Sequence, residues 1–168
     1  MGDSTHRLAG ALRWIADLLQ RTGIPFQVVG GVAVVAYGAP PRSVADIDLY
    51  IPADGLPRLI RRARAQVVRQ PWRHRDEWWD RILCVLEHEG QRIEVGVADA
   101  ARLRDLTSGE WTNATIDFDA SVLRTVWGVE VPVMPLAQIV EYKQQLGLEI
   151  DARDLAELVR AYGEADGL

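Results

Sequence analysis

Two aspartates, Asp46 and Asp48, lie one residue apart in the segment Ala45-Asp46-Ile47-Asp48-Leu49-Tyr50. The apolar residues of this segment alternate as in a β-strand, in which residues i and i+2 point to the same face of the sheet. The two carboxylates are therefore expected side by side. Two like charges held together cost stability unless a cation lies between them, and Mg²⁺ prefers carboxylate oxygens, water and phosphate as ligands. The pair is thus a candidate metal site.

A third carboxylate, Glu94, occupies the middle of a second strand-like segment, Gln91 to Val97. The apolar residues of this segment share one face, so Glu94 lies on the other. We expect its strand to neighbour the aspartate strand, with the carboxylates within about 10 Å, because shared coordination allows only roughly 2.1 Å per ligand. Asp99 is the second choice for a third ligand, and the alternative for Glu94 is the polar face of a hairpin.

A glycine pair, Gly30 and Gly31, follows the apolar residues Val28 and Val29. After a strand, such a pair opens a helix with bare backbone N–H groups that an anion can approach closely. The pair is therefore a candidate phosphate-binding turn. Because it forms neither a G-x-G-x-x-G nor a Walker pattern, a tight turn without a ligand is the alternative.

The elements that must position these residues follow from the hydrophobic periodicity of the chain. Helices are predicted over residues 4–22, 31–37, 56–63, 100–106, 135–146 and 151–162, with Asp151 as N-cap of the last. Strands are predicted over residues 25–29, 46–51, 81–87, 91–98, 121–127 and 129–133. This order predicts an α+β fold, in which a small mixed β-sheet is flanked by helices and followed by a C-terminal helical pair.

The length of 168 residues predicts a single domain over residues 1–168, with a core at about 25–100 and C-terminal strands and helices at about 120–163. The lone cysteine, Cys84, lies in an apolar run and is expected to be a buried thiol. No secretory leader or membrane-spanning run is visible, so we expect a cytoplasmic protein without a membrane partner.

Charge is distributed unevenly along the chain. The net charge is −5, which argues against a protein whose whole surface clamps nucleic acid. Residues 58–75, however, hold seven arginines and no acid. With Trp72, Trp78 and Trp79 they form a candidate surface for phosphates and flat rings, and the alternative is a solvated helix face with tryptophans covering the sheet.

The order of these motifs resembles the nucleotidyltransferase superfamily typified by DNA polymerase β, including its small bacterial lincosamide nucleotidyltransferases and AbiEii-like toxins. Their pattern runs G-G or G-S, then R-x-T-x-D-[ILV]-D-[LIV], then a later strand with a third acid. It is matched here by Gly30, Gly31, Arg42, Asp46, Asp48 and Glu94. Two positions depart from it, since Val44 replaces the usual threonine and Glu94 the commoner aspartate. The resemblance covers residues 25 to 160.

The resemblance implies roles for individual residues. Asp46, Asp48 and Glu94 would be catalytic and would hold two Mg²⁺ ions, with Glu94 accepting the proton of the attacking hydroxyl. The nucleotide-binding residues would be Gly30, Gly31, Arg42, Ser43 and Lys143. Lys143 belongs to a helix that follows the family-like segment Val131-Pro132-Val133, and its alternative is a solvated lysine on an amphipathic helix.

The implied activity is Mg²⁺-dependent transfer of a nucleoside monophosphate from an NTP to an acceptor hydroxyl. The acceptor could be an RNA end, a protein hydroxyl in a toxin–antitoxin setting, or an antibiotic, and the sequence does not decide among them. For an antibiotic, the candidate contacts are Asp76, Glu77 and Asp80. The sequence does not decide whether the protein forms a homodimer. The second hypothesis, based on Val44 and Glu94, is a catalytically degenerate domain that binds nucleotide or a partner without turnover.

Overall fold

The computed structural model describes residues 3–40, 44–105 and 108–166. Its helices are α1 Asp3–Thr22, α2 Gly30–Ala36, α3 Leu56–Arg62, α4 Leu136–Leu146 and α5 Glu149–Asp166. Its strands are β1 Gln27–Val29, β2 Ile47–Ile51, β3 Val67–Arg75, β4 Trp79–His88, β5 Gln91–Val97, β6 Arg102–Arg104, β7 Trp111–Asn113, β8 Val122–Val126 and β9 Val129–Val133. Among the helices so described, none has the length and apolar character needed to cross a membrane.

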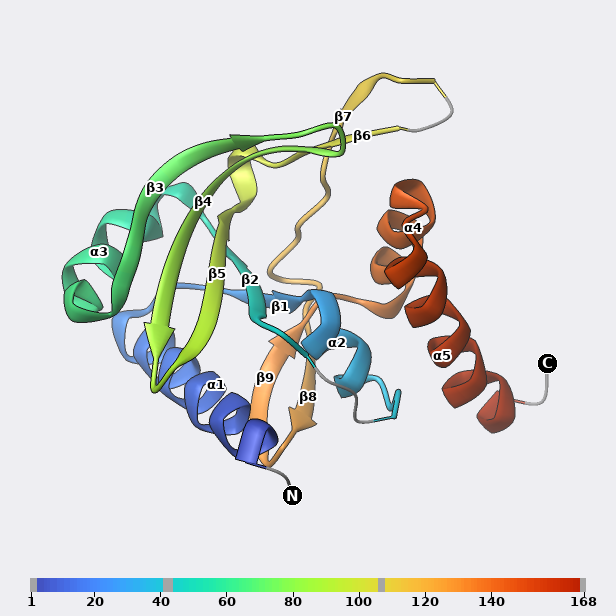
Figure 1. Cartoon of the computed structure of the whole chain (residues 1–168), viewed down its shortest axis with the longest axis horizontal. Coiled ribbons are helices and arrows are strands. Elements are labelled where there is room, and N and C mark those ends of the chain that lie inside the picture. The colour runs from blue at the N-terminus through green and yellow to red at the C-terminus, as the bar shows by residue number, and fades with distance from the viewer. Residues whose placement is uncertain (1–2, 41–43, 106–107, 167–168) are drawn as a thin grey trace.

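Across the described ranges, nine strands form one mixed sheet in the order β7-β6-β4-β5-β2-β1-β9-β8, with β3 paired to β4 beside this path (Figure 1). The pairs β2–β5 and β1–β9 are parallel and the others are antiparallel. The α+β class is therefore confirmed, with a larger sheet than expected. Cys84 on β4 is fully buried, as predicted, and burial raises its pKa to about 11.

The helices cover the sheet in two groups. α1 is amphipathic and buries Leu8, Leu12, Ile15 and Leu19 in the core, which confirms the helix predicted over residues 4–22. It packs against β5, β9 and α3, whereas α4 and α5 pack against each other, with α5 also contacting α2 (Figure 1). The central sheet strands thus lie between α1 and the α2–α4–α5 group.

Strand register brings the sequence motifs together. Val29, the last residue of β1, pairs with Asp48 of β2, and Asp48 in turn pairs with Glu94 of the parallel strand β5. Paired residues in neighbouring strands share a face, so the two carboxylates are direct neighbours. The chain leaves β1 at Val29 and enters α2 at Gly30. The glycine pair, the aspartates and Glu94 therefore converge in the middle of the sheet.

The helix predicted over residues 100–106 is wrong. The described part of this segment has a short 3₁₀ turn at Ala98–Ala100 and then strand β6, in which Leu103 is buried between exposed arginines. Arg102-Leu103-Arg104 alternates as a strand, and Leu103 pairs with Trp79 of β4. Three residues were too short a run to distinguish this alternation from a helical pattern.

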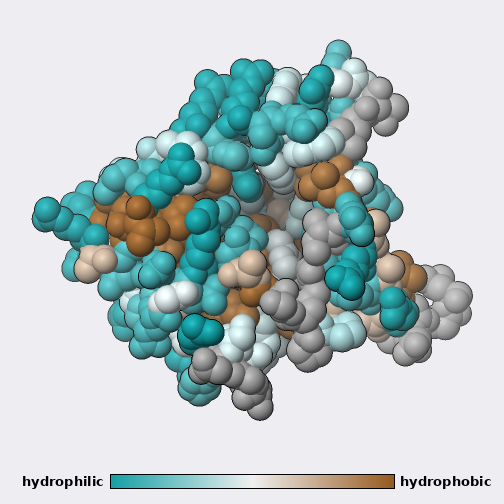
Figure 2. Space-filling model, in the orientation of Figure 1, coloured by the Kyte–Doolittle hydropathy of each residue, from teal (hydrophilic) through white to brown (hydrophobic). Residues whose placement is uncertain are grey.

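Strand β3 was not predicted at all. It is the outer partner of β4, and most of its side chains are exposed, so the apolar alternation that normally identifies a strand is absent. Figure 2 shows hydrophobic side chains gathered at the left over α3 and β3, where Val68 is 59% exposed, within an otherwise mostly hydrophilic face. The arginine-rich segment is thus part helix and part edge strand.

Candidate active site

Three carboxylates form a compact group on the sheet, which we call the carboxylate cluster: Asp46, Asp48 and Glu94. Oxygens of all three lie within 4.8 Å of one another, and each side chain is half-buried. Asp46 immediately precedes β2, Asp48 lies within it, and Glu94 lies on β5. The expected proximity of Glu94 to the aspartate strand is therefore found in the structure.

The carboxylate cluster is electrostatically unfavourable as an isolated group. The pKa of Asp48 is raised to about 7, first by burial and then by the charges of Asp46 and Glu94. Burial and Glu94 likewise raise the pKa of Asp46. Mutual repulsion among oxygen-only donors is the property that a hard divalent cation relieves, so these residues fit Mg²⁺.

Arg92 orients one member of the cluster. Its Nε and Nη2 donate to the same oxygen of Glu94, Oε1, at 3.0 and 2.6 Å, because residues i and i+2 of β5 share a face. The other carboxylate oxygen of Glu94, Oε2, accepts neither of these two hydrogen bonds. The Arg92 side chain is itself half exposed, so the pair lies at the solvent edge of the cluster.

The glycine pair lies directly against Asp48. Gly30 has a φ of 63°, and a Cβ placed there would lie 2.5 Å from Asp48 Oδ2. A side chain at position 30 would thus be excluded both by backbone conformation and by the aspartate. Val29, the N-cap residue of α2, has no side chain that caps the helix, and the Gly30 amide donates instead to the hydroxyl of Tyr142 on α4. Gly30 and Gly31 open onto the same pocket as Asp46 and Asp48, as expected.

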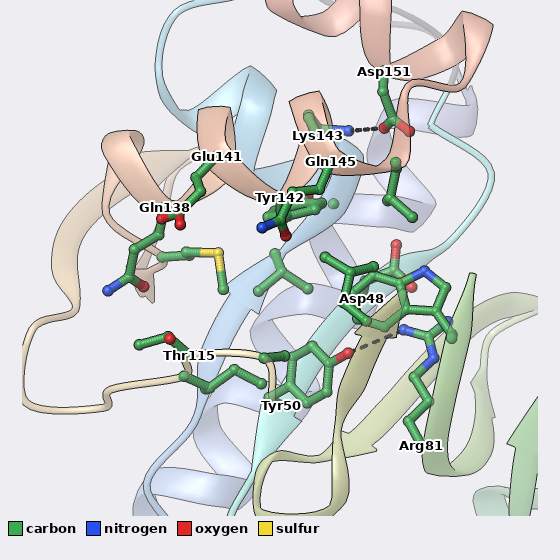
Figure 3. Close-up of a pocket in the computed structure, with 18 of the residues that line it drawn as sticks. Asp48, Tyr50, Arg81, Thr115, Gln138, Glu141, Tyr142, Lys143, Gln145 and Asp151 are labelled. Atoms are coloured by element: carbon green, nitrogen blue, oxygen red, sulfur yellow. Dashed lines mark hydrogen bonds and ion pairs between the residues drawn. The ribbon is translucent and has the colours of Figure 1, made fainter. Parts of the chain in front are cut away.

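That pocket has a volume of about 600 Å³ and lies between the sheet and α4 (Figure 3). Its wall combines the glycine turn, the two aspartates, the segment 112–116 and one side of α4. Glu94 lies beside the aspartates and is not on this wall. Side chains of the wall that Figure 3 labels are Asp48, Tyr50, Arg81, Thr115, Gln138, Glu141, Tyr142, Lys143, Gln145 and Asp151.

Lys143 lines this pocket but is engaged by two acids, and we call Lys143, Asp151 and Asp154 the lysine cluster. Its Nζ lies 2.7 Å from Asp151 Oδ1 and 2.7 Å from Asp154 Oδ2, and all three residues are buried. Burial lowers the Lys143 pKa, but Tyr142 and the two aspartates outweigh it, so the pKa is raised overall. The alternative of a solvated lysine is therefore wrong.

The prediction that Asp151 is the N-cap of the last helix is also wrong. α5 begins two residues earlier, at Glu149, and Asp151 already lies in its first turn. Its carboxylate pairs with Lys143 of α4 instead of with amides of its own helix. The αL conformation of Gly147, with a φ of 59°, ends α4 and turns the chain so that the two helices meet.

Arg81 and Tyr50 are pocket residues that sequence reasoning missed. Arg81 Nη1 donates to Tyr50 Oη at 3.1 Å, and the guanidinium lies 4.7 Å from the ring centroid of Trp79 (Figure 3). Burial lowers the Arg81 pKa, but Tyr50, Asp48 and Glu94 raise it overall. The spacing of Tyr50, two residues after Asp48 on β2, is the signal that it shares the carboxylate face.

Other sequence candidates lie elsewhere. Asp80 accepts two hydrogen bonds from Arg73, and Asp76 accepts from the amides of Trp78 and Trp79, so these acids are used locally and do not line the pocket. Of the three tryptophans, Trp79 alone lines it among the described residues. Arg42 and Ser43 lie outside the described residues.

Comparisons with known proteins agree with this arrangement. The chain matches the model of the aminoglycoside-2″-adenylyltransferase family over residues 11–160. A candidate nucleotidyltransferase of Thermotoga maritima, TM1012, is 23% identical, with a TM-score of 0.65 and coverage of 92% of this chain and 91% of that one. A search of curated protein sequences finds no match.

Two antibiotic-modifying enzymes share the fold. The lincosamide antibiotic adenylyltransferase LnuA, solved with lincomycin bound, is 17% identical, with a TM-score of 0.58 and coverage of 88% and 93% of the two chains. ANT(2″)-Ia, solved with adenylyl-2″-tobramycin, is 12% identical, with a TM-score of 0.60 and coverage of 94% and 91%. The resemblance to nucleotidyltransferases is confirmed, and because the family match spans most of the chain, this protein belongs to the aminoglycoside-2″-adenylyltransferase family and is a nucleotidyltransferase.

Proposed function

We propose that this protein transfers AMP from ATP to a hydroxyl group of a small molecule in a Mg²⁺-dependent reaction. The observation that carries the proposal is the carboxylate cluster, with its oxygens within 4.8 Å of one another, at a pocket of about 600 Å³ that the glycine turn also lines. Family membership supports the donor, since the matched family is named for adenylyl transfer.

Asp46, Asp48 and Glu94 are the residues that would hold Mg²⁺, and two ions are expected. When bound, the metal supplies charge stabilisation to the triphosphate and to the developing pyrophosphate. The raised pKa values of Asp46 and Asp48 support this assignment, because a cation would relieve the repulsion that raises them.

The residues around the carboxylate cluster bind and orient the nucleotide. Gly30 and Gly31 present backbone that the β- and γ-phosphates can approach, and Arg42 and Ser43 are proposed as further contacts. Lys143 contributes positive charge to the same pocket, although its two hydrogen bonds to aspartates hold it on the α4–α5 side. We therefore assign it a supporting role in nucleotide binding.

The transfer step is a displacement at the α-phosphorus. The acceptor oxygen forms a new bond to that phosphorus, the bond to the β-phosphate bridging oxygen breaks, and pyrophosphate leaves. The hydroxyl proton passes to the Glu94 carboxylate, whose orientation Arg92 fixes through Oε1. A carboxylate fixed in this way favours proton transfer at its other oxygen.

Pocket size supports a small-molecule acceptor over RNA or protein. The volume of about 600 Å³, which the nucleotide shares, falls within the range of roughly 300–1,000 Å³ that is typical of small-molecule sites. The arginines of residues 58–75 do not line this pocket; three of them, Arg58, Arg61 and Arg62, line a separate groove beside α1. The groove and the pocket share no described lining residue, so the arginines do not support a polymeric acceptor.

The test is incubation with ATP labelled at the α-phosphate, Mg²⁺ and a panel of hydroxylated antibiotics, followed by mass spectrometry of the products. The expected result is an acceptor whose mass rises by one AMP group, and this product should disappear in Asp46→Asn and Asp48→Asn. Asp54→Asn, which changes an exposed acid elsewhere, is the matched control. Metal-dependent nucleotide binding with no labelled antibiotic, RNA or protein would instead support the binding module that Val44 and Glu94 suggest.

A further inference from the structure

Six of the seven arginines in residues 58–75 form two groups in the structure. The three on β3 have partners beside them: Arg73 donates two hydrogen bonds to Asp80, and the guanidinium groups of Arg69 and Arg75 lie over tryptophan rings. The three on α3 line the groove beside α1, which shares no described lining residue with the active-site pocket. The arginines of α3 therefore need an explanation of their own.

We call this second depression the arginine groove. It has a volume of about 410 Å³ and is lined by residues of α1 and α3: Leu18, Arg21, Thr22, Arg58, Arg61 and Arg62. The arginines of α3 share one helix face, because residues at i, i+3 and i+4 are neighbours, whereas Leu59 is buried in the core. In Figure 1, α3 lies on the opposite side of the view from the α4–α5 pair. Four guanidinium groups and no carboxylate thus line the groove among the described residues.

The positive charges of the arginine groove have no acid paired with them. No ion pair in the described part of the chain involves any of the four arginines, although Asp17 and Asp54 lie four residues before Arg21 and Arg58. The Nη1 of Arg58 donates to the Thr22 carbonyl at 3.4 Å. Like charges at i and i+4 of a helix destabilise it. A bound anion would relieve this repulsion.

Helix dipoles explain only part of this arrangement. Arg21 lies in the last turn of α1, and Arg61 and Arg62 lie in the last turn of α3, where a cation is stabilised. Arg58, however, lies in the first turn of α3, where its own helix disfavours a cation. Its guanidinium reaches the end of α1 and lines the same groove. An anionic ligand accounts for all four positions.

We propose that the arginine groove is a second anion site, which binds a compact ligand with two or more linked phosphate groups. Guanidinium groups bind phosphate oxygens through paired, charge-assisted hydrogen bonds. Two or three linked phosphate groups carry about three to four negative charges at neutral pH, which match the four arginines. A groove of about 410 Å³ also has more room than a single phosphate ion needs. This site is separate from the one that transfers AMP.

The test is calorimetric titration of the protein with inorganic pyrophosphate in EDTA and about 150 mM NaCl. Without a divalent cation, the carboxylate cluster repels phosphate groups, so binding reports the arginine groove. Pyrophosphate should bind with one equivalent and at least about tenfold more tightly than sulfate. In the double variant Arg61→Gln with Arg62→Gln, its binding should weaken by at least about tenfold, because charge-assisted hydrogen bonds are lost. Replacement of both arginines by lysine keeps the charge and should retain part of the affinity.

Two further double variants are the controls. Arg13→Gln with Arg153→Gln removes the same charge at exposed positions of α1 and α5 and should bind pyrophosphate as the wild-type protein does. Asp46→Asn with Asp48→Asn changes the active site and should also leave this binding unchanged, since neither residue lines the arginine groove. Melting curves show whether each variant is folded.

A titration with ATP in EDTA identifies the source of the phosphate groups. Affinity equal to that of pyrophosphate would indicate a nucleotide, whereas weaker binding would indicate free pyrophosphate or polyphosphate, and either result supports the site. Absence of pyrophosphate binding to the wild-type protein, or equal loss in the Arg13 and Arg153 control, would overturn it. Loss in the Asp46 and Asp48 variant would place the anion in the active site and would also overturn it.

A polymer is the remaining alternative. If a single-stranded RNA oligonucleotide binds through Arg61 and Arg62 while pyrophosphate does not bind, the proposed ligand class is wrong. None of these outcomes bears on the transfer of AMP, which the assay with labelled ATP and Mg²⁺ tests. The two proposals therefore succeed or fail independently.

Discussion

The carboxylate cluster and the lysine cluster lie at the same pocket but compensate their charges differently. In the lysine cluster, Lys143 lies between two buried aspartates, so each acid has an opposite charge beside it within the protein. In the carboxylate cluster, three acids repel one another, and Asp48 has a pKa of about 7 as a result of burial and this repulsion. The pairing of opposite charges indicates a structural link between α4 and α5, whereas the repulsion among three like charges indicates a candidate cation-binding site.

Replacing the cation of the lysine cluster should give the largest effect. Lys143→Met keeps the side-chain length but removes the positive charge that both buried carboxylates contact, and it should lower the free energy of unfolding by about 3–5 kcal/mol. Denaturant unfolding measures the change. Arg153→Met, at an exposed position of α5, is the control and should change it by less than about 0.5 kcal/mol. A stable Lys143→Met protein would contradict this structural link.

The opposite behaviour is expected when the carboxylate cluster loses a charge. Asp48→Asn removes one of three repelling acids, so the free energy of unfolding should not fall. AMP transfer should nevertheless decrease by about 10²–10³-fold, which corresponds to roughly 3–4 kcal/mol in the transition state. Steady-state kinetics and thermal melting of the same preparation measure both effects. An Asp48→Asn protein that is less stable but fully active would contradict this prediction, because Asp48 would then stabilise the fold and have no part in AMP transfer.

Addition of Mg²⁺ should stabilise the wild-type protein. Binding to the folded state alone contributes about 2.7 kcal/mol at a free concentration of 100 times Kd, so the melting temperature should rise with Mg²⁺ concentration. NaCl at equal ionic strength is the control for screening. The shift should be absent from the double variant Asp46→Asn with Asp48→Asn and kept in Asp54→Asn. An equal shift in the double variant would show that the metal binds elsewhere.

The smallest effect is expected at the solvent edge of the carboxylate cluster. Arg92→Gln breaks an ion pair whose arginine is half exposed, so stability should change by less than about 1 kcal/mol. Transfer should fall by about tenfold, because Glu94 loses the group that orients it. Arg92→Lys should restore part of the rate. Identical kinetics for the wild-type and Arg92→Gln proteins would mean that Glu94 needs no orientation.

The sequence was sufficient to predict on which strand face each acid of the carboxylate cluster lies, because side-chain alternation along a strand is a local property. A D-x-D pattern in a strand places both acids on one face whatever surrounds it, and the face of Glu94 followed from the apolar residues beside it. The turn at Gly30 was equally local. The class of the fold then followed from the order of these elements.

Features that depend on distant partners were harder to predict. Strand β6 forms because Leu103 pairs with Trp79, and its alternating pattern is only three residues long. Strand β3 forms because it pairs with the edge of β4, and most of its side chains are exposed. The pairing of Lys143 with Asp151 and Asp154 depends on how sharply the chain turns at Gly147. Arg81 escaped notice for the same reason, since its partner Tyr50 lies on another strand.

The parallel pairing of β2 with β5 has a consequence for folding kinetics. Asp48 and Glu94 become neighbours only when two strands separated by α3, β3 and β4 have joined, and such long-range pairing forms slowly. An unfolded chain therefore offers Mg²⁺ two of the three carboxylates at most. If this pairing forms after the folding transition state, Mg²⁺ will slow unfolding while leaving the refolding rate nearly unchanged.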